Sequence, residues 1–322
     1  MAVGRTPRRP GRACRPKVAL LASPLVIALL AACQPGAEPA RNASAGTSPV
    51  VVASFNFPES ELLAAIYGLA LRHAGIPVRL RLDLGPRELV EPALEQGLVN
   101  LVPEYLGAAL TSIEPHPSVT MTDPAAVRAA LARAFAAWNV AVLTPARAQD
   151  QNGVAVAHGT AARLHLRTLS DLRHAAGSMV LGGPPECVFR PACLPGLRSA
   201  YGLRFARFLP FGTEQQRVTA LKYGVVNAAV LFTTDGNLAD GSLVLLTDNR
   251  HLQPAENVVP VVTARALARY GQRLATAVNA VSAQLTSAEL LFLNWRIEVA
   301  GHGVLAEARA WLERHGILPS PG

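Results

Sequence analysis

The chain has 322 residues, of which 50% are hydrophobic and 16% charged, enough to bury one large core or two medium ones. Its formal net charge is +8 at pH 7, but six of its 30 basic residues lie in residues 1–17, where there is no acid. The rest of the chain has 24 basic and 22 acidic residues, so its formal net charge is +2. Because no stripe of Lys and Arg with interleaved aromatic residues remains, the composition argues against nucleic-acid binding.

The amino terminus has the pattern of a secretory signal. An apolar run from Val18 to Ala32 follows the basic residues, and it is shorter than the roughly 20 residues that span a membrane. The run ends in L-A-A-C, which resembles the lipobox of bacterial lipoproteins, so we expect residues 1–32 to be a signal peptide and Cys33 to carry lipid. A secreted protein with an unmodified cysteine is the alternative.

The next segment, residues 33–48, is rich in Ala, Gly, Pro and Ser, and we expect it to be a flexible tether. No second long apolar segment follows, which excludes a multi-span permease.

The first folded stretch is predicted to be a strand that leads into a helix. A valine-rich run from Val50 stops at Ser54, and Pro58 opens a segment with apolar residues at helical spacing that closes at Gly75. In open α/β sheets, small ligands sit where strands end and helices begin. The turn therefore supplies candidate ligand residues, although an ordinary β-α turn is the alternative: Ser54, Phe55, Asn56 and Phe57.

Two segments in different halves of the chain resemble each other, A-L-E-Q-G-L-V-N at 93–100 and A-L-K-Y-G-V-V-N at 220–227. Each is predicted to be a helix end with a glycine cap, followed by a buried strand. The strands end in P-E-Y at 103–105 and F-T-T-D at 232–235, and a weaker copy of the strand-to-turn pattern runs from Met179 to Glu186. We expect two similar α/β lobes, with chance similarity as the alternative.

Other elements follow from local signals. A helix near Pro86 to Gln96 contains Pro92, which costs roughly 3 kcal/mol in a helix interior, so we expect a kink or a late start there. Asp123 is the expected N-cap of a helix that runs to Trp138. Strands are predicted at 139–143, 154–157, 242–246 and 258–262, and a helical tail at 264–317. Strands in both halves with a helical tail indicate an α/β fold.

Cys187 and Cys193 lie six positions apart, and outside the cytoplasm a disulfide is the favoured interpretation. A metal-binding pair is the alternative, but the C-x5-C spacing is unusual for zinc and no histidine is near. We expect no metal and no cofactor.

Several motifs together carry a family resemblance. The segments S-F-N-F-P-E-S-E-L-L, L-V-P-E-Y-L-G-A-A-L-T, P-P-E…C-L-P-G-L-R-S-A-Y-G-L and A-L-K-Y-G-V-V-N-A-A-V-L-F-T-T-D-G resemble the substrate-binding proteins of osmoprotectant ABC importers, of the glycine betaine, carnitine and choline type. The resemblance runs from about Pro49 to about Pro319. It implies a two-lobed type II periplasmic-binding-protein fold, with a ligand cleft between the lobes and crossovers near Asp150 and Asn257. Lobe 1 would comprise residues 49–150 and 255–322, and lobe 2 residues 151–254.

The resemblance also implies an aromatic cage for a quaternary ammonium group. Tyr105 matches the cage tyrosine of the family's P-E-Y-x-G motif, whereas Asn152 and Val218 stand where the family often has aromatic residues. Phe55, Phe57 and Phe232 are candidate replacement faces, and core packing is the alternative for Tyr105 and Phe232. For Ser54, Asn56 and Thr233 the alternative is hydrogen bonding to backbone groups. Asp150 or Asp235 would balance a positive charge. The full set of expected ligand residues is Ser54, Phe55, Asn56, Phe57, Tyr105, Asp150, Gln151, Asn152, Phe232, Thr233, Thr234 and Asp235.

Enzyme motifs are missing from the sequence: there is no G-x-x-x-x-G-K-[ST], H-E-x-x-H, G-x-S-x-G or G-x-G-x-x-G. The acids Glu59 and Glu61 fall in a predicted first helical turn, where the helix dipole accounts for them.

We therefore expect a monomeric, lipid-anchored, extracytoplasmic receptor that passes a quaternary-amine solute to an ABC permease and ATPase. The alternatives are a receptor for an amino-acid betaine such as ergothioneine, or a sensory surface lipoprotein with the same cleft.

Overall fold

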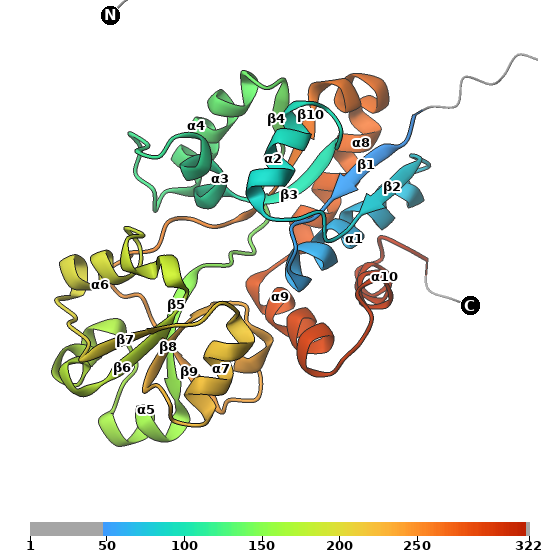
Figure 1. Ribbon diagram of the computed structural model, residues 1–322. Helices are drawn as coiled ribbons and strands as arrows, with labels where there is room; N and C mark the ends of the chain where they lie inside the picture. The colour runs from blue at the N-terminus through green and yellow to red at the C-terminus, as the bar shows by residue number, and fades with distance from the viewer. Residues whose placement is uncertain (1–47, 320–322) are drawn as a thin grey trace, which may run out of the picture. The chain divides into compact units, whose positions relative to one another are not determined.

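The computed structural model describes residues 48–319, and the predicted signal peptide, Cys33 and residues 33–47 of the tether lie outside the described residues. Two five-stranded mixed sheets organise the chain, and we call each sheet with its helices a lobe (Figure 1). The sheet of lobe 1 has the order β2-β1-β3-β10-β4, and that of lobe 2 the order β7-β6-β8-β5-β9. The predicted α/β class is confirmed. No helix within residues 48–319 combines the length and the apolar character that a membrane span needs.

Lobe 1 is built from both ends of the described chain. Its strands are β1 (Val50–Ala53), β2 (Val78–Arg81), β3 (Leu101–Tyr105), β4 (Val140–Val142) and β10 (Val258–Thr263). Its helices are α1 (Pro58–His73), α2 (Arg87–Glu95), α3 (Leu106–Ile113), α4 (Pro124–Ala136), α8 (Ala264–Gln284), α9 (Ser287–Asn294) and α10 (Val304–Arg314), with a π-helical turn at Trp295–Val299 between α9 and α10.

The core of lobe 1 forms around α1. This helix is buried along most of its length because it packs against the sheet on one side and against α8 and α10 on the other (Figure 1). Leu62, Leu63 and Ile66 are fully buried, and each such side chain stabilises the fold by about 1.5 to 3 kcal/mol. The predicted strand-to-helix unit is confirmed, with β1 ending at Ala53 and α1 beginning at Pro58.

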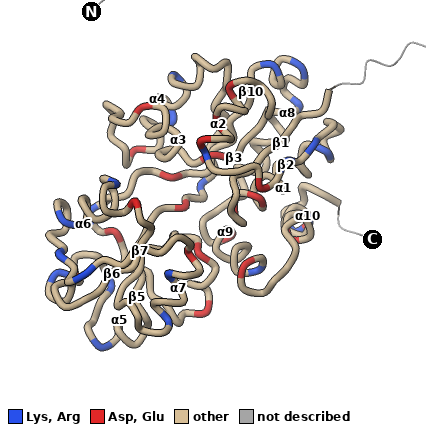
Figure 2. Tube along the Cα trace, in the orientation of Figure 1, with Lys and Arg blue, Asp and Glu red and all other residues tan. Residues whose placement is uncertain are grey.

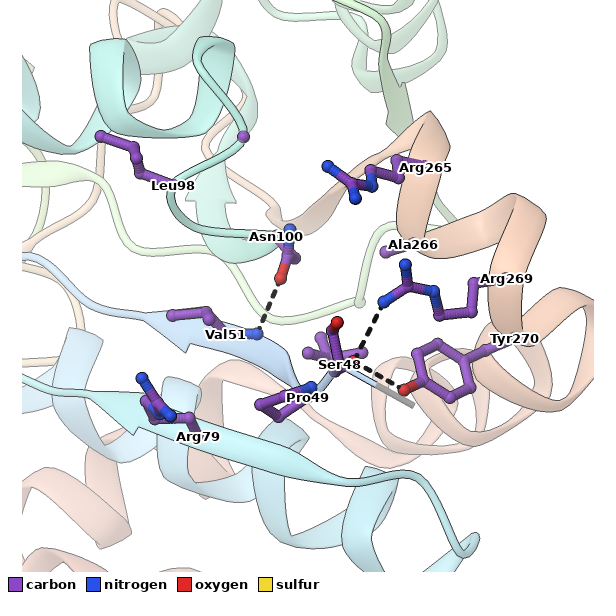
Figure 3. Close-up of a pocket in the computed structure, with 12 residues that line it drawn as sticks. Ser48, Pro49, Val51, Arg79, Leu98, Asn100, Arg265, Ala266, Arg269 and Tyr270 are labelled. Atoms are coloured by element: carbon purple, nitrogen blue, oxygen red, sulfur yellow. Dashed lines mark hydrogen bonds between the residues drawn. The ribbon is translucent and has the colours of Figure 1, made fainter. Parts of the chain in front are cut away.

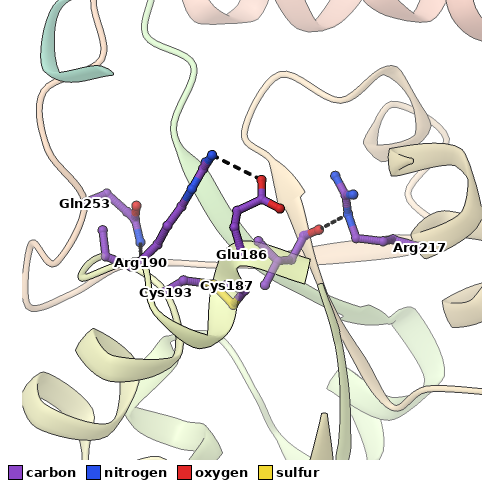
Figure 4. The surroundings of a disulfide bond; sticks show 8 residues. Glu186, Cys187, Arg190, Cys193, Arg217 and Gln253 are labelled. Atoms are coloured by element: carbon purple, nitrogen blue, oxygen red, sulfur yellow. Dashed lines mark hydrogen bonds and ion pairs between the residues drawn. A yellow bond between two sulfur atoms is a disulfide. The ribbon is translucent and has the colours of Figure 1, made fainter. Parts of the chain in front are cut away.

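Lobe 2 has shorter helices and more 3-10 turns. Its strands are β5 (Asn152–Ala157), β6 (Val180–Gly183), β7 (Arg207–Pro210), β8 (Ala228–Phe232) and β9 (Leu243–Leu246). Its helices are α5 (His158–Leu164), α6 (Leu194–Tyr201) and α7 (Glu214–Lys222), with 3-10 turns η1 (Leu169–His174), η2 (Ala176–Ser178), η3 (Pro185–Val188) and η4 (Gly236–Leu238). The predicted disulfide is present between Cys187 and Cys193 and closes the loop between η3 and α6 (Figure 4).

The two repeated segments occupy equivalent places in the lobes. Gly97 and Gly224 both end a helix with positive φ, at 69° and 70°. Asn100 then accepts a hydrogen bond from Val51 N at 2.9 Å and donates its own N–H to Val51 O at 2.8 Å. Asn227 does the same with Val180, at 2.8 and 2.9 Å. Each asparagine thus joins the start of one strand to its parallel neighbour, as expected for two similar lobes.

The chain crosses between the sheets twice, within residues 143–151 and 247–257. The crossovers lie side by side: Gln149 and Asn257 form an antiparallel bridge, and Asp150 N donates to Glu256 O at 3.1 Å. A Cβ on Gly107 would lie 2.8 Å from Pro254, so the second crossover can approach α3 only because residue 107 has no side chain. The expected crossovers near Asp150 and Asn257 are confirmed.

Some expected elements differ in detail. α2 begins at Arg87, directly after Pro86, and continues through Pro92, so the expected late start is wrong. Proline is tolerated there because tertiary packing of Val90 and Leu94, both buried, offsets its local cost. The tail is nearly all helical, as expected, through α8, α9, the π-helical turn and α10, and Gly271 interrupts α8 with φ 55° and ψ −141°. The helix capped by Asp123 is confirmed, and the cap oxygen accepts from Ala125 N at 3.0 Å.

Candidate ligand-binding site

The lobe 1 half of the predicted site is a row of three rings where β1 and β3 end. The Phe55 and Phe57 centroids are 6.0 Å apart, and those of Phe57 and Tyr105 are 6.3 Å apart. Phe55 and Tyr105 are buried, Phe57 is half-buried and Asn56 is exposed. The β1 turn and the last residue of β3 come together because these strands are parallel neighbours.

Arg87 modifies this half of the site. Its guanidinium carbon lies 4.9 Å from the Phe55 ring centroid, in cation-π geometry. It also donates to Glu104 through Nη2 at 2.8 Å and Nε at 3.3 Å. One face of Phe55 is therefore already covered by a cation, which leaves Phe57 and Tyr105 as the lobe 1 rings better placed to meet a ligand.

Two predicted hydroxyl groups already serve the backbone. The Ser54 hydroxyl accepts from Asp83 N at 2.9 Å and is fully buried. The Thr233 hydroxyl accepts from Gln151 N at 2.9 Å, while Thr233 N donates to Gln151 O at 2.8 Å. Both therefore have the backbone role that such side chains often take in turns.

The lobe 2 half gathers the start of β5 and the end of β8. Asn152 and Phe232 are paired across these antiparallel strands, and the Phe232 side chain is 37% exposed. Asp150 accepts from Thr234 N at 3.3 Å. Asp235 caps η4 by accepting from Asn237 N at 2.8 Å, and its other oxygen is buried without a hydrogen-bond partner in the described part of the chain.

Glu59 joins the two halves. Its carboxylate accepts from the Tyr105 hydroxyl at 2.6 Å, from the Thr234 hydroxyl at 2.6 Å and from Asn294 Nδ2 at 2.5 Å. It is 4% exposed. The helix dipole was expected to account for this acid, and it does lie in the first turn of α1, but its three buried partners give it a further role as a link between lobes.

The end of α9 and the turn that follows it form another connection to lobe 2, besides the crossovers and Glu59. Asn294 Nδ2 also donates to Thr234 O at 2.8 Å. A Cβ on Gly236 would lie 2.6 Å from Trp295 N, so η4 rests directly on the backbone at the α9 terminus. Any side chain at 236 would separate the two segments.

The junction between the lobes is rich in carboxyl groups. Burial raises the pKa of Glu59, against the lowering effect of its three donors. Burial and the Glu59 charge hold the pKa of Asp150 well above its usual range. Burial and the charges of Asp235 and Glu59 raise the pKa of Glu298 to about 7, and burial and Asp235 raise that of Glu214 to about 8. Such shifts are typical of like charges held together away from water.

Three of these acids have only neutral hydrogen-bond donors. Glu59, Asp150 and Asp235 bond to hydroxyl, amide and backbone groups, and among residues 48–319 none of them forms an ion pair. Acidic positions also mark the crossover segments between the sheets (Figure 2). The arrangement would stabilise a cation next to the Tyr105 ring.

The remaining sequence candidates belong to the scaffold. Val218 is 1% exposed in the lobe 2 core, so the position where the family often has a tyrosine is filled by core packing here. The disulfide loop is tied to the second crossover by Gln253, whose Nε2 donates to Ala192 O at 2.8 Å (Figure 4). Within the described residues, no group of three or more His, Cys, Asp or Glu side chains is placed to hold a metal ion.

Comparisons with known proteins agree with this architecture. Residues 48–314 match the family described as the substrate-binding domain of the ABC-type glycine betaine transport system. The chain is 28% identical over 279 residues to the glycine betaine-binding protein YehZ of Escherichia coli K12, covering 84% of this chain and 91% of that protein. The solved apo structure of YehZ superposes with a TM-score of 0.72 and 27% identity, over 84% of this chain and all of that one.

A further relative comes from Helicobacter pylori strain G27, the ergothioneine transport permease/ergothioneine binding protein EgtU. It is 24% identical over 270 residues, which is 84% of this chain and 48% of that protein.

Proposed function

We propose a function from one premise: the chain belongs to the family of substrate-binding domains of ABC-type glycine betaine transport systems. On that premise, the protein captures a quaternary-amine solute outside the cytoplasm and delivers it to an ABC permease and its ATPase. Glycine betaine, choline and carnitine are the ligands to consider first. The lobes hold the ligand between the end of β3 and the end of β8.

The observation that carries this proposal is the proximity of aromatic rings to carboxyl groups that form no ion pair within residues 48–319. A quaternary ammonium group cannot donate hydrogen bonds, so it is held by the negative faces of rings and by nearby negative charge. Phe57 and Tyr105 supply ring surface at one edge of lobe 1. Glu59 and Asp150 lie at the same junction with only neutral hydrogen-bond partners. Because burial raises the pKa of both groups, a bound cation would stabilise their ionised forms.

A second candidate ligand is an amino-acid betaine such as ergothioneine. Its support is the similarity to EgtU over 84% of this chain, together with Asn152 at a position where the family often has an aromatic residue. An amide there favours a ligand with more hydrogen-bonding groups than glycine betaine. Both candidates share a trimethylammonium group, so they share the Tyr105 contact.

The test is a thermal-shift panel of glycine betaine, choline, carnitine, proline betaine and ergothioneine. A ligand at 100 times its dissociation constant adds about 2.7 kcal/mol to the free energy of unfolding. We expect Tyr105→Ala to abolish the shift for the best ligand and Tyr105→Phe to keep most of it, because the phenylalanine retains the ring. Tyr223→Ala is the matched control, since Tyr223 is 83% exposed. A full shift in Tyr105→Ala would place the ligand elsewhere.

Delivery to a permease is tested by uptake. Cells that lack this protein should lose uptake of the radiolabelled ligand and regain it when the gene is restored. Normal uptake in such cells, with ligand binding intact in the purified protein, would favour the sensory surface lipoprotein instead.

The lipid anchor on Cys33 and the monomeric state are also proposals. Labelling cells with a clickable fatty acid should mark the protein, and Cys33→Ala should remove the label. Sedimentation of the purified protein should give one species near the chain mass of 33.9 kDa, less any leader that is removed. A label that survives Cys33→Ala, or a dimer, would reject the corresponding proposal.

A further inference from the structure

A cavity of about 300 Å³ lies at the amino end of β1, whereas the candidate ligand site lies beyond the other end of that strand (Figure 3). Its walls come from four places: residues 48–51, β2, the loop at 97–100 and the first turns of α8. Because these walls share no residue with the rings or carboxylates described above, the cavity is a separate feature of lobe 1.

Three arginines line the cavity. Arg79 comes from β2, and Arg265 and Arg269 come from α8, all three exposed (Figure 3). None of the twelve lining residues is acidic. Within residues 48–319, none of the three guanidinium groups forms an ion pair. The cavity is therefore a concentrated positive region in a chain whose basic and acidic residues nearly balance after the leader.

The spacing on α8 makes this region unfavourable without a counter-charge. Arg265 and Arg269 are four residues apart, so they lie on one helix face, where like charges destabilise a helix. Arg269 uses one N–H on Ser48 O at 3.2 Å, and its other donors remain available. Figure 2 shows that basic positions recur along α8 and on β2. An anion in the cavity would relieve the repulsion.

The polar lining consists mostly of donors. Asn100 Oδ1 accepts from Val51 N at 2.9 Å, and Figure 3 shows its amide nitrogen on the side away from Val51. The Tyr270 hydroxyl donates to Ser48 O at 2.8 Å. Guanidinium and amide N–H groups without a carboxylate nearby suit an oxyanion, and the planar guanidinium matches a phosphate through two parallel hydrogen bonds.

We propose that this cavity binds a phosphate group through Arg79, Arg265 and Arg269, as a second site independent of the solute site. A volume of about 300 Å³ exceeds that of a bare phosphate and admits a phosphate ester. The ester has two possible sources, a soluble organic phosphate or the headgroup of an anionic phospholipid. The second source has a geometric basis, because Ser48 lines the cavity and is the last residue of the predicted tether.

The experiment uses the full chain and four probes. Inorganic phosphate and glycerol 1-phosphate are titrated at constant ionic strength against chloride, with thermal shift and calorimetry as readouts. Flotation with phosphatidylglycerol vesicles is compared with flotation with phosphatidylcholine vesicles. We expect saturable binding of a phosphate probe and at least a tenfold loss of affinity in the double variant Arg265→Gln/Arg269→Gln.

The matched control is Arg163→Gln/Arg173→Gln, which removes the same charge from exposed positions of lobe 2. Binding of inorganic phosphate or glycerol 1-phosphate that depends on Arg265 and Arg269 identifies a soluble ligand, and dependence only in the phosphatidylglycerol arm identifies a lipid headgroup. Both outcomes support the phosphate site. Equal losses in both double variants, or no saturable binding of any phosphate probe, would overturn it.

Discussion

The two lobes share one scaffold and stabilise it differently. In each, a glycine-capped helix end leads into an asparagine that bonds both backbone groups of a residue on the parallel neighbour, Asn100 with Val51 and Asn227 with Val180. After this common unit the lobes diverge. The strand β1 leads into α1, a largely buried helix of 16 residues, whereas β6 leads into a 3-10 turn and a disulfide loop.

This difference shows where each lobe obtains its rigidity. Lobe 1 surrounds α1 with the sheet, α8 and α10, so apolar burial fixes the turn that carries Phe55 and Phe57. Lobe 2 has no such helix after β6, and a covalent link fixes the corresponding loop. Glu59 and the end of α9 connect the end of β8 to lobe 1, besides the crossovers.

The largest expected effect comes from Glu59→Ala, which breaks the connection between the lobes. It leaves the buried Tyr105 and Thr234 hydroxyl groups without their acceptor and removes one of the two acceptors of Asn294 Nδ2, so we expect a loss of about 3 to 5 kcal/mol in the free energy of unfolding. Glu61→Ala is the control, because Glu61 lies in the same helical turn and should lose only about 0.3 to 1 kcal/mol. Urea denaturation of both variants decides the matter, and equal losses would mean that the helix dipole explains both acids.

Removal of the disulfide tests the stabilisation of lobe 2. We expect Cys187→Ser/Cys193→Ser to lower the free energy of unfolding by about 2 to 3 kcal/mol, since the closed loop is short. Calorimetry should show the loss as an earlier transition of lobe 2, with the transition of lobe 1 unchanged. A single transition that moves as a whole would show that the lobes do not differ in this way.

The pH dependence of the free energy of unfolding should report on the acid-rich junction between the lobes. The pKa of Glu214 in the folded chain is about 8, above its ordinary value of 4.5, so the folded state holds a proton that the unfolded state releases. Its contribution is fully present below pH 4.5 and is lost as the pH rises toward 8, with a slope of at most about 1.4 kcal/mol per pH unit.

We therefore expect the free energy of unfolding to fall between pH 5 and pH 8, and Glu214→Gln to flatten that slope. Glu91, Glu256 and Glu298, each with a pKa raised to about 7, keep part of the slope in the variant. Urea midpoints at four pH values measure it. A slope that Glu214→Gln leaves unchanged would contradict the assignment.

The smallest expected effect tests whether Asn100 and Asn227 have equivalent roles in the two lobes. Asn100→Ala and Asn227→Ala each remove one side-chain acceptor, and we expect losses of about 1 to 1.5 and about 0.5 to 1 kcal/mol, larger for the part-buried Asn100. Asn100→Asp and Asn227→Asp keep an acceptor and should lose less. A loss in one lobe only would show that the repeated segments are not equivalent.

Local signals made much of the fold predictable. The strand-to-helix unit at Val50 and Pro58, the paired glycine-asparagine segments and the disulfide each depend on residues close in sequence. Pro92 led to the expectation of a kink or a late start, and the late start is wrong because tertiary packing overrides the local cost of proline. The edge strands β2 and β7 contain no fully buried residue, and their sequences V-R-L-R and R-F-L-P lack the apolar runs that predicted the other strands.

The candidate site was less predictable because its main connection is long-range. Glu59 forms hydrogen bonds with Thr234 and Asn294, which lie 175 and 235 positions away in the sequence. No local sequence pattern predicts partners at such a distance. Arg87, which covers one face of Phe55, was missed for the same reason. The one signal in the sequence for the role of Glu59 is its place in P-E-S, directly after the aromatic turn. The helix dipole also explains an acid at this position.

The most direct test of the account is calorimetric titration of the best ligand from the panel into the wild-type protein, Tyr105→Ala in lobe 1 and Phe232→Ala in lobe 2. The account predicts one ligand per chain and at least a tenfold weaker affinity in both variants, because rings from both lobes hold the same molecule. Unchanged affinity in both variants, or two independent ligands per chain with each variant affecting only one, would contradict it.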